Sequence, residues 1–549
     1  MSHLNKITIA QLFDDIVAQY PDHEALVYPA AGLRYSYKEL QAACNQFAKG
    51  LMKLGVKKGD HLAVWATNVP EWVITQFACA KLGAVLIALN YSFEVLELEY
   101  QLQQSDAVTL VMMEGTTDSN FRSMIYELAP ELNECKAGEL AANRFPLLRN
   151  VIMIGGKKHP GMFTWGDVLK AGESISDQAL AERSATIDPD DPVVMVFTSG
   201  TTSRPKRVML THYNIIANAM AQADCMNLTP QDRMCIAMPF FHCMGAISSN
   251  LCCVSVGATM VPVETFDPDI VLRTVEKERC TALHGVPSMF IMELEQLEKE
   301  NYDISSLRTG IIAGDMCSPD LIKKIVDVMH MRDIITSYGQ SEASPCITST
   351  RFDDPLEIRA STVGKALPGV EVKIIDTKTG ETLPPGSQGE ICARGYNITK
   401  GYYKMPEATA NKIDSEGWVH TRDLGTMDED GYCKITCRIK ELIIYRGEHI
   451  YPIEVENFLR THPLIKDAQV VGVPSEKYGQ EVMAFIRVNE EHTLTAEEVR
   501  NFCKGKIASW KIPRHIIFVN EYPTTTSGKV QKSKLREMAK KMLDRQGSH

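Results

Sequence analysis

The chain has 549 residues, of which 44% are hydrophobic and 23% charged, and its formal net charge is −11. This length is too great for one hydrophobic core and predicts two or more domains. The acidic balance argues against a nucleic-acid-binding or anionic-membrane protein, and no run of about 18 apolar residues predicts a membrane span.

Helical and strand patterns alternate in the first part of the chain. Apolar residues recur at helical spacing over 37–54 and 71–82, and short apolar runs at 61–66 and 84–89 predict strands. This order predicts parallel sheets flanked by helices. The alternation continues through expected strands at 260–263, 282–287 and 310–314, and through a helix at 269–277.

One polar loop follows the apolar run 193–197, which reads as a buried strand. Its sequence, TSGTTSRPK at 198–206, combines hydroxyls, glycine and a lysine. Backbone N–H groups, hydroxyls and an ammonium in such a loop suit a phosphate. It is not a Walker loop, because Pro205 and Arg207 stand where that motif has a glycine and a magnesium-binding hydroxyl.

The pattern changes after about residue 364. Short strands at 370–376 and 389–395 predict a β-rich subdomain over about 364–438. Residues 439–549 then predict a small α+β domain, with helices at 453–461 and 496–506 and strands at 468–473 and 482–488. The expected fold is therefore α/β. A large N-terminal domain at 1–438, with αβ-layered subdomains and the β-rich subdomain, precedes the small C-terminal domain.

Nine strings in a fixed order resemble the adenylate-forming superfamily of acyl-CoA synthetases, luciferases and peptide-synthetase adenylation domains. The resemblance runs from the region of Leu12 to Arg536. HGVP (284–287) and MDEDGY (427–432) are most similar to synthetases of medium-chain, branched or ring carboxylic acids. The strings are TSGTTSRPKRVMLTH (198–212), PFFHCMG (239–245), AGD (313–315), YGQSE (338–342), GYY (401–403), GWVHTRDLG (417–425), CRIKELIIYRGEHIYPIEVE (437–456), VGVPSEKYGQ (471–480) and PTTTSGKVQK (523–532).

The resemblance implies an AMP-forming acyl-CoA synthetase, an acid–thiol ligase. ATP and a small carboxylic acid give an acyl-adenylate and pyrophosphate, and the acyl group then passes to coenzyme A with release of AMP. The implied cofactor is Mg²⁺, and no nucleic acid is an expected partner. A homodimer is left open.

The resemblance also implies roles for nucleotide-site residues. Glu342 matches the magnesium carboxylate, and a hard oxygen donor suits this ion. Tyr338 would stack on adenine beside Gly314 and Asp315, and Asp423 and Arg438 would reach the ribose. The pyrophosphate loop matches Thr198, Ser199, Gly200, Thr201, Thr202 and Lys206, and the remaining nucleotide-site matches are Ser337, Gly339, Gln340 and Ser341.

Three further positions match residues of the two reaction steps, and a separate set of residues is expected at the acyl site. Lys529 matches the lysine that bridges the carboxylate and the α-phosphate, and Lys440 the hinge of a rotating C-terminal domain. Rotation would move Lys529 away before the thiol arrives. Gly447 would lie at the pantetheine tunnel. The candidates for the acyl pocket are His242, with a catalytic role also expected, Cys243, Met244, Gly245, Val286, Pro287, Ile312 and Ala313.

The chain departs from its family at glycine positions of these motifs. Glycine in such loops serves positive φ or close ligand approach. Three replacements are arginines that we expect at or beside the nucleotide and thiol sites. Asp315, Tyr445 and His449 also replace the usual residues. The non-glycine positions are Ser203, Arg207, Arg422, Cys437 and Arg446.

Two alternatives to the synthetase remain. An acyl-AMP ligase that loads a carrier protein would form no CoA thioester, and a non-catalytic nucleotide-binding protein would release no pyrophosphate with any acid. Intact Lys529 and Glu342 argue against the second. The arginines also raise the hypothesis that the reaction runs in reverse to make ATP. Fifteen scattered cysteines, no signal-peptide core and no paired metal spacing predict free thiols in a cytoplasmic protein.

Overall fold

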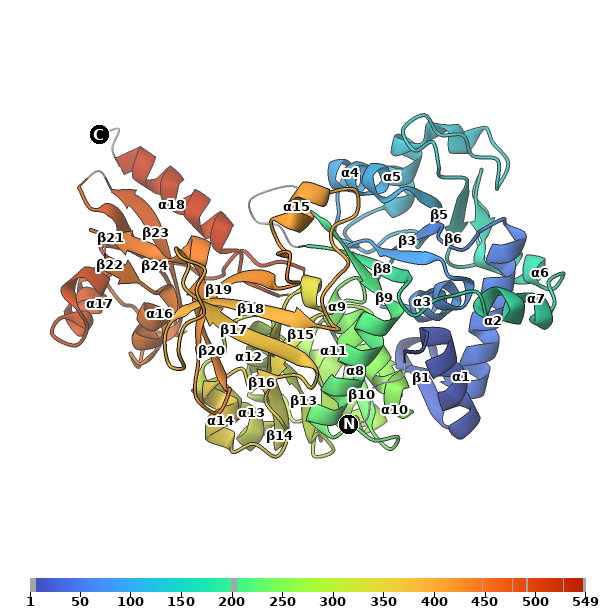
Figure 1. The fold of residues 1–549 in the computed structure, drawn as a ribbon. Coiled ribbons are helices and arrows are strands. Elements are labelled where there is room, and N and C mark those ends of the chain that lie inside the picture. The colour runs from blue at the N-terminus through green and yellow to red at the C-terminus, as the bar shows by residue number, and fades with distance from the viewer. Residues whose placement is uncertain are drawn as a thin grey trace.

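A computed structural model describes residues 6–198, 205–446, 448–475, 477–489, 492–526 and 528–546. Two large sheets and their helices form the N-terminal part, a four-stranded sheet lies beside them, and a further sheet forms the C-terminal part. In Figure 1 the C-terminal sheet, drawn orange to red, lies at the opposite end of the molecule from α1 and α2 in blue. The expected α/β fold class, with a large N-terminal and a smaller C-terminal part, is confirmed.

The first large sheet is seven-stranded, in the order β7-β6-β5-β3-β4-β8-β9. Its strands pair in parallel except β8 with β9, which form an antiparallel edge. Every residue of β3 is buried, as expected for a strand covered on both faces. The strands are β3 (His61–Trp65), β4 (Val85–Ala88), β5 (Ala107–Met112), β6 (Asn150–Met153), β7 (Phe163–Thr164), β8 (Pro192–Phe197) and β9 (Arg207–Thr211).

The second large sheet is nine-stranded, in the order β16-β15-β14-β13-β12-β10-β11-β1-β2. Its central strands are parallel, so their carboxyl ends meet at one edge, where α/β proteins bind ligands. The strands are β1 (Glu24–Tyr28), β2 (Leu33–Ser36), β10 (Arg233–Ile236), β11 (Thr259–Pro262), β12 (Ala282–Leu283), β13 (Thr309–Ile312), β14 (Asp333–Gly339), β15 (Cys346–Ser349) and β16 (Lys365–Ala366).

The two large sheets share one hydrophobic core with the helices packed on them. α3 is buried on all sides except at Glu71, and α8 is nearly as buried. Local signals fix helix ends: Ser36 and Glu39 form a capping box for α2, and Gly83, at φ 72°, ends α3. The helices of this part are α1 (Ile9–Gln19), α2 (Tyr37–Lys53), α3 (Pro70–Leu82), α4 (Val95–Ser105), α5 (Phe121–Leu128), α6 (Trp165–Gly172), α7 (Asp177–Ser184), α8 (His212–Met226), α9 (Cys243–Gly245), α10 (Cys252–Val256), α11 (Pro268–Glu278), α12 (Pro287–Leu297), α13 (Pro319–Val328), α14 (Leu356–Ser361) and α15 (Pro406–Ala410).

Two smaller sheets complete the fold. The four-stranded sheet is antiparallel and consists of β17 (Val370–Ile375), β18 (Gly389–Gly395), β19 (Val419–Met427) and β20 (Cys433–Arg438). The C-terminal sheet has the order β22-β21-β24-β23, and β25 pairs with β24. Its elements are β21 (Ile443–Tyr445), β22 (Glu448–Ile450), α16 (Pro452–Arg460), β23 (Ile465–Ser475), β24 (Gly479–Val488), α17 (Ala496–Cys503), β25 (His515–Phe518) and α18 (Lys532–Gln546).

The strand predicted over 282–287 is mostly wrong. β12 contains only Ala282 and Leu283, because Pro287 already begins α12 and Gly285 makes only an isolated bridge to Ile312. The cysteines are free, as predicted, and all but Cys135 and Cys317 are buried. Among the described residues, no helix has the length and apolar character needed to cross a membrane.

Candidate active site

A cavity of about 480 Å³ lies at the carboxyl ends of β13 and β14, where residues from the C-terminal part close over it. β14 ends at Gly339, and a short turn then carries Ser341 and Glu342 into the wall. Gly339 allows the wall to close tightly, because a Cβ there would lie 1.9 Å from the Pro345 carbonyl oxygen. The predicted nucleotide and catalytic residues that line the cavity are Thr198, Lys206, His242, Gly314, Ser337, Tyr338, Gly339, Gln340, Ser341, Glu342, Asp423, Arg438, Lys440 and Lys529.

The cavity is strongly cationic, although the chain as a whole is acidic. Among the described residues of its lining, six cationic side chains face two carboxylates, Glu342 and Asp423. Desolvation and the Lys529 ammonium lower the pKa of His242 to about 4, so this imidazole is neutral at physiological pH. The six cations are Lys206, Lys412, Arg422, Arg438, Lys440 and Lys529. Such a lining suits a polyanionic ligand.

Tyr338, Asp423 and Arg438 form one connected group. The Tyr338 hydroxyl donates to Asp423 Oδ2 at 2.8 Å, and Arg438 Nε lies 3.6 Å from Asp423 Oδ1. β19 and β20 place Asp423 directly opposite Arg438 in their antiparallel register. The arrangement holds a carboxylate where two neighbouring hydroxyls of a sugar could donate to it.

Glu342 is held by an aromatic hydroxyl. Its side chain is buried in the cavity wall, and the Tyr402 hydroxyl donates to Oε1 at 2.6 Å. Lys206 Nζ lies 4.8 Å from the centre of the Tyr402 ring. The sequence analysis noted the GYY string but gave no role to Tyr402, which the structure places as the positioning partner of Glu342.

The sequence analysis also missed Lys412. This lysine is only 8% exposed, and its Nζ donates to Gln340 Oε1 at 3.0 Å and, more weakly, to the Thr421 carbonyl at 3.5 Å. Burial lowers its pKa, against the opposing effect of the Glu342 and Asp423 carboxylates. No sequence motif marks it, because it lies between the recognised motifs.

Lys529 enters the cavity on a tight turn from the C-terminal part. Two hydrogen bonds join Thr525 and Lys529. The Thr525 N–H donates to the Lys529 carbonyl at 2.8 Å, and the Lys529 N–H donates to Thr525 Oγ1 at 3.1 Å. Gly528, at φ 81°, makes the turn possible. Desolvation and Arg438 lower the pKa of Lys529, while Asp315, Asp423 and Glu441 oppose this shift.

Three polar contacts dock the C-terminal part on the N-terminal part in this arrangement. Ser288 Oγ donates to the Gly528 carbonyl at 2.6 Å, and Asn90 Nδ2 to Thr526 Oγ1 at 3.3 Å. Lys466 forms an ion pair with Glu295 at 2.7 Å. The Ser288 contact sets the Lys529 turn against the start of α12.

The ends of the predicted phosphate loop are pinned together. The Thr198 N–H donates to the Lys206 carbonyl at 2.9 Å, and the Lys206 N–H donates to Thr198 Oγ1 at 3.1 Å. Both residues line the cavity. The other members of the loop, Ser199, Gly200, Thr201, Thr202 and Ser203, lie outside the described residues, as does Gly447.

The predicted acyl pocket is brought together only in part. Met244, Val286 and Ala313 line the cavity with His242, whereas Cys243, Gly245, Pro287 and Ile312 do not. Side chains alternate along a strand, so Ile311 faces the cavity and Ile312 points away. Burial raises the pKa of the Cys243 thiol to about 12, which argues against a nucleophile there. The lining residues that the sequence analysis missed at this end are Gln222, Met238, Ser248 and Ile311.

A second cavity, of about 400 Å³, adjoins the first. Gly314, Tyr338, Asp423, Arg438 and Lys529 border both cavities. Asp315 and Cys437 border only the second, where residues of the C-terminal part form the other wall. The predicted purine slot, between Tyr338 and the Gly314–Asp315 backbone, therefore opens between the two cavities.

Two of the three unusual arginines have the left-handed backbone that favours glycine. Arg422 has φ 64° and Arg446 φ 50°. Arg422 lines the cavity, whereas Arg446 lies 4.4 Å over the Tyr478 ring. Arg207 is buried away from the cavity lining, with Nη2 donating to the Tyr403 carbonyl at 3.2 Å. Of the three arginines expected at or beside the ligand sites, only Arg422 lines a cavity, and Arg207 and Arg446 do not.

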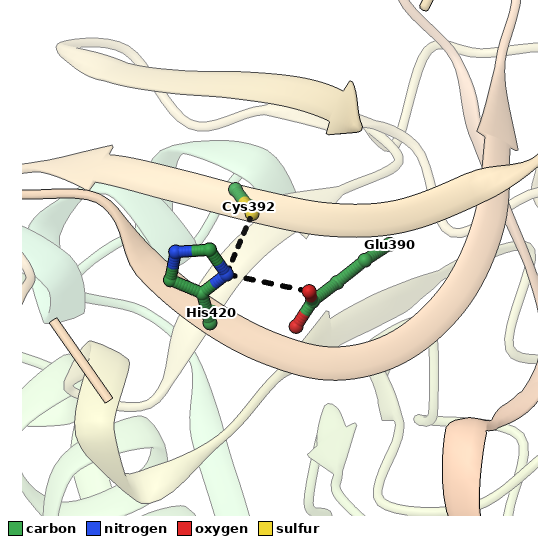
Figure 2. Close-up of side chains that lie close together, drawn as sticks. All are labelled: Glu390, Cys392 and His420. Atoms are coloured by element: carbon green, nitrogen blue, oxygen red, sulfur yellow. Dashed lines mark hydrogen bonds and ion pairs between the residues drawn. The ribbon is translucent and has the colours of Figure 1, made fainter. Parts of the chain in front are cut away.

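A cluster on β18 and β19 supports the turn at Arg422 (Figure 2). Glu390 Oε1 accepts the Arg422 N–H at 2.9 Å, and Oε2 lies 3.3 Å from His420 Nδ1. Cys392 Sγ lies 3.7 Å from the same nitrogen. The cluster thus anchors the strand immediately before Asp423.

We expect the Arg422→Gly variant to be more stable than the native chain. A non-glycine residue in the left-handed region is strained, and relief of this strain outweighs the added freedom of glycine in the unfolded chain. The free energy of unfolding should rise by about 1 kcal/mol. Denaturant unfolding measures it, with Arg422→Ala as the control that removes the side chain but keeps the strain. A gain as large in the alanine variant would assign the effect to the charge and not to the backbone.

Comparison with known proteins was made at the level of sequence and of structure. Residues 13–403 match the model of the family described as AMP-binding enzyme, and residues 454–529 match the AMP-binding enzyme C-terminal domain. A Bacillus subtilis (strain 168) protein that carries the name acyl-CoA synthetase YngI is 49% identical over 99% of both chains. The medium-chain acyl-CoA ligase ACSF2, mitochondrial, of Danio rerio is 39% identical over 98% of this chain and 89% of its own length.

Solved structures are similar over nearly the whole chain. The ATP-bound crystal structure of MatB from Rhodopseudomonas palustris has a TM-score of 0.85 at 28% identity, covering 98% of this chain and all of that one. The o-succinylbenzoate CoA synthetase MenE of Bacillus subtilis, in complex with its acyl-adenylate intermediate OSB-AMP, has a TM-score of 0.76 at 26% identity, covering 96% and 97%.

Proposed function

Because the chain belongs to the AMP-binding enzyme family and is an AMP-forming acyl-CoA synthetase, we propose that the cationic cavity is where both of its half-reactions occur. In the first, a carboxylate oxygen attacks the α-phosphorus of ATP and pyrophosphate leaves. In the second, the thiol of coenzyme A attacks the acyl carbonyl and AMP leaves. The observation that carries the proposal is the convergence of Lys529, Glu342 and Asp423 on one cavity.

The first half-reaction brings two anions together, so positive charge is its main requirement. Lys529 is the residue placed to lie between carboxylate and α-phosphate, because its turn carries the ammonium into the cavity beside Arg438 and Asp423. Asp423 would accept the two ribose hydroxyls, with Tyr338 and Arg438 fixing its orientation. The pinned ends of the phosphate loop hold Lys206 for the departing pyrophosphate.

Glu342 fits the implied Mg²⁺. It offers a hard carboxylate oxygen in the cavity, since among the described residues only Tyr402 hydrogen-bonds its side chain, at Oε1. When bound, the ion would neutralise phosphate charge during pyrophosphate departure. Tyr402 keeps the carboxylate oriented for this role.

The second half-reaction requires Lys529 to leave, because it occupies the approach to the adenylate. We propose that the C-terminal part rotates near Lys440, which lies in the short helical turn Ile439–Glu441 directly after β20. The polar contacts at Ser288, Asn90 and Lys466, described above, would have to break at that edge. Coenzyme A would then enter from the side of β21 and β22.

The variant Lys440→Pro tests the hinge. Proline fixes φ near −65° and limits rotation about this residue. We expect acid-dependent ATP–pyrophosphate exchange to stay within about threefold of the native rate, and CoA thioester formation to fall at least about tenfold. Lys434→Pro, within β20, is the control for general damage. If Lys440→Pro forms thioester at the native rate, the hinge lies elsewhere.

The substrate proposed here is a medium-chain carboxylic acid. Its apolar end would lie against Met238, Met244, Val286, Ile311 and Ala313, which line the cavity together with His242. Support comes from these side chains and from the medium-chain acyl-CoA ligases related to this chain. Gln222 and Ser248, which also line the cavity, add polar groups that suit a ring or branched acid as well.

A panel of acids tests this function. Pyrophosphate release should be fastest with octanoate, slower with palmitate and acetate, and thioester should form only when coenzyme A is present. Pyrophosphate release without any CoA thioester would favour the ligase that loads a carrier protein. Nucleotide binding without pyrophosphate release from any acid would favour a non-catalytic protein. The ATP-forming direction stays a prediction, and it depends on how tightly the cavity retains pyrophosphate.

A further inference from the structure

Two of the six cavity cations have no place in the proposed reaction. The resemblance to the family assigns a role to four of the cations, which are Lys206, Arg438, Lys440 and Lys529. It assigns no role to Lys412 or Arg422. Lys412 follows α15, and Arg422 lies on β19. Both line the cavity, and Lys412 Nζ donates to Gln340, two residues before Glu342.

Lys412 is a buried ammonium whose hydrogen-bond acceptors are uncharged. Its two acceptors are the Gln340 side-chain oxygen and the Thr421 carbonyl. No carboxylate lies within ion-pair distance of its Nζ in the part of the chain that the structure describes. A charge buried in this way is costly unless a counter-charge arrives.

Gln340 adds an unpartnered donor at the same place. Its side-chain oxygen accepts from Lys412, so its Nε2 group points elsewhere. That nitrogen is buried and, among the described residues, has no hydrogen-bond acceptor. Because Gln340 lines the cavity, the amide is a donor that an anion there could satisfy.

Arg422 brings a second cation to this side. Glu390 holds its backbone N–H, and the left-handed φ turns the side chain into the cavity lining. Within the described ranges, no ion pair involves its guanidinium. The charge of Arg422 influences two neighbouring side chains. It opposes the rise in the pKa of Tyr402 and adds to the lowering of the pKa of Lys412.

We propose that Lys412, Arg422 and the Gln340 amide form a pyrophosphate-binding subsite beside Glu342. This inference rests on the proposed nucleotide site and deepens it. Two cations and one neutral donor match a diphosphate, which presents several acceptor oxygens and a high negative charge. The ribose group at Tyr338, Asp423 and Arg438 is already internally paired, so the subsite lies on the side of Glu342 and Lys206.

The subsite makes pyrophosphate a strongly retained product. It binds charge through side chains and therefore holds pyrophosphate even without a divalent ion. Retention slows the forward reaction when pyrophosphate accumulates, and it raises occupancy for the ATP-forming direction at low pyrophosphate concentration.

Calorimetric titration of inorganic pyrophosphate into the full chain tests the subsite, first in EDTA and then with magnesium. Arg422→Gly and Lys412→Met should each weaken pyrophosphate binding by about tenfold in EDTA, because each removes one charge-assisted contact. Arg446→Gly is the matched control, since it removes the same charge from another left-handed position that lines neither cavity. It should bind pyrophosphate as the native chain does. Arg422→Lys should recover part of the affinity.

The possible outcomes distinguish a failure of the proposed subsite from a failure of the proposed function. If the native chain binds AMP and pyrophosphate but Arg422→Gly and Lys412→Met bind pyrophosphate equally well, the subsite is wrong and the synthetase stands. If the native chain binds AMP but no pyrophosphate in EDTA, the subsite is also wrong. If the native chain binds neither, the proposed site itself fails. Thermal unfolding of each variant, without ligand, confirms that a loss of binding is not a loss of fold.

Discussion

Alanine in place of Lys529 is expected to abolish acyl-adenylate formation while leaving thioester formation from supplied acyl-adenylate intact. The ammonium is needed only while the carboxylate approaches the α-phosphate, where two negative charges meet. Loss of one such contact in a water-poor site lowers the rate by about 10²–10³-fold. Acid-dependent ATP–pyrophosphate exchange measures the first half-reaction, and release of AMP from purified acyl-adenylate with coenzyme A measures the second.

This test depends on the difference between the rates lost in the two half-reactions. Lys534→Ala serves as the control, because it removes an exposed lysine of α18 a short distance along the same chain segment. It should leave both half-reactions unchanged. An equal loss of both in Lys529→Ala would mean that the lysine supports the fold or general nucleotide binding and not the meeting of the two anions.

Glutamine in place of Glu342 is expected to slow adenylation on the order of a hundredfold and to raise the magnesium concentration needed for half-maximal rate. The substitution keeps the shape of the side chain and the hydrogen bond from Tyr402, but removes the charge that would hold the ion. Exchange rates measured over a magnesium titration give both quantities. A native titration curve for Glu342→Gln would place the metal elsewhere.

Substitution of two neighbouring tyrosines tests the orientation of the Glu342 carboxylate separately from its charge. Tyr402→Phe removes only the 2.6 Å hydrogen bond to Glu342, so we expect a loss of about tenfold, smaller than that of Glu342→Gln. Tyr403→Phe is the matched control. Its hydroxyl donates to Asp106, away from the cavity. If the two phenylalanine variants behave alike, Tyr402 does not position Glu342.

The sequence predicted the alternating elements well because their signals are local. The period of apolar residues in 37–54, with the capping box at its start, is sufficient for α2. The strand predicted over 282–287 is mostly wrong, and the reason for this is also local. Its apolar residues are buried, as in a strand, but Gly285 and Pro287 divide them between a short strand, a turn and the start of α12.

The candidate site was predictable where a motif marks a loop at a strand end. Glu342, Asp423 and Lys529 come from three distant segments, and their common cavity is what the resemblance implied. Ile312 was misplaced by one residue, which reverses the face of a strand. Lys412 could not be found at all, since nothing distinguishes a buried lysine from a surface one until the segment after α15 meets the turn after β14 at Gln340.

The positions where this chain lacks the glycines of its family show what a comparison of motifs adds to secondary-structure propensity. A backbone that needs positive φ was inferred from the missing glycines, and Arg422 and Arg446 adopt it. The direction of the side chains was not inferable. Arg207 turns toward Tyr403 because β9 pairs with β8 in a register that directs it there.

The docking of the C-terminal part also separates the speed of this enzyme from its selectivity. In the proposed cycle the lysine that makes the adenylate and the side chains that choose the acid lie on different bodies, joined at Lys466 and Glu295 and by the two hydrogen bonds near α12. Substitutions at those docking residues alter how long the closed arrangement lasts, without touching an atom that contacts the acid. Turnover and substrate choice can therefore be changed independently, by evolution or by design, at different residues of the same chain.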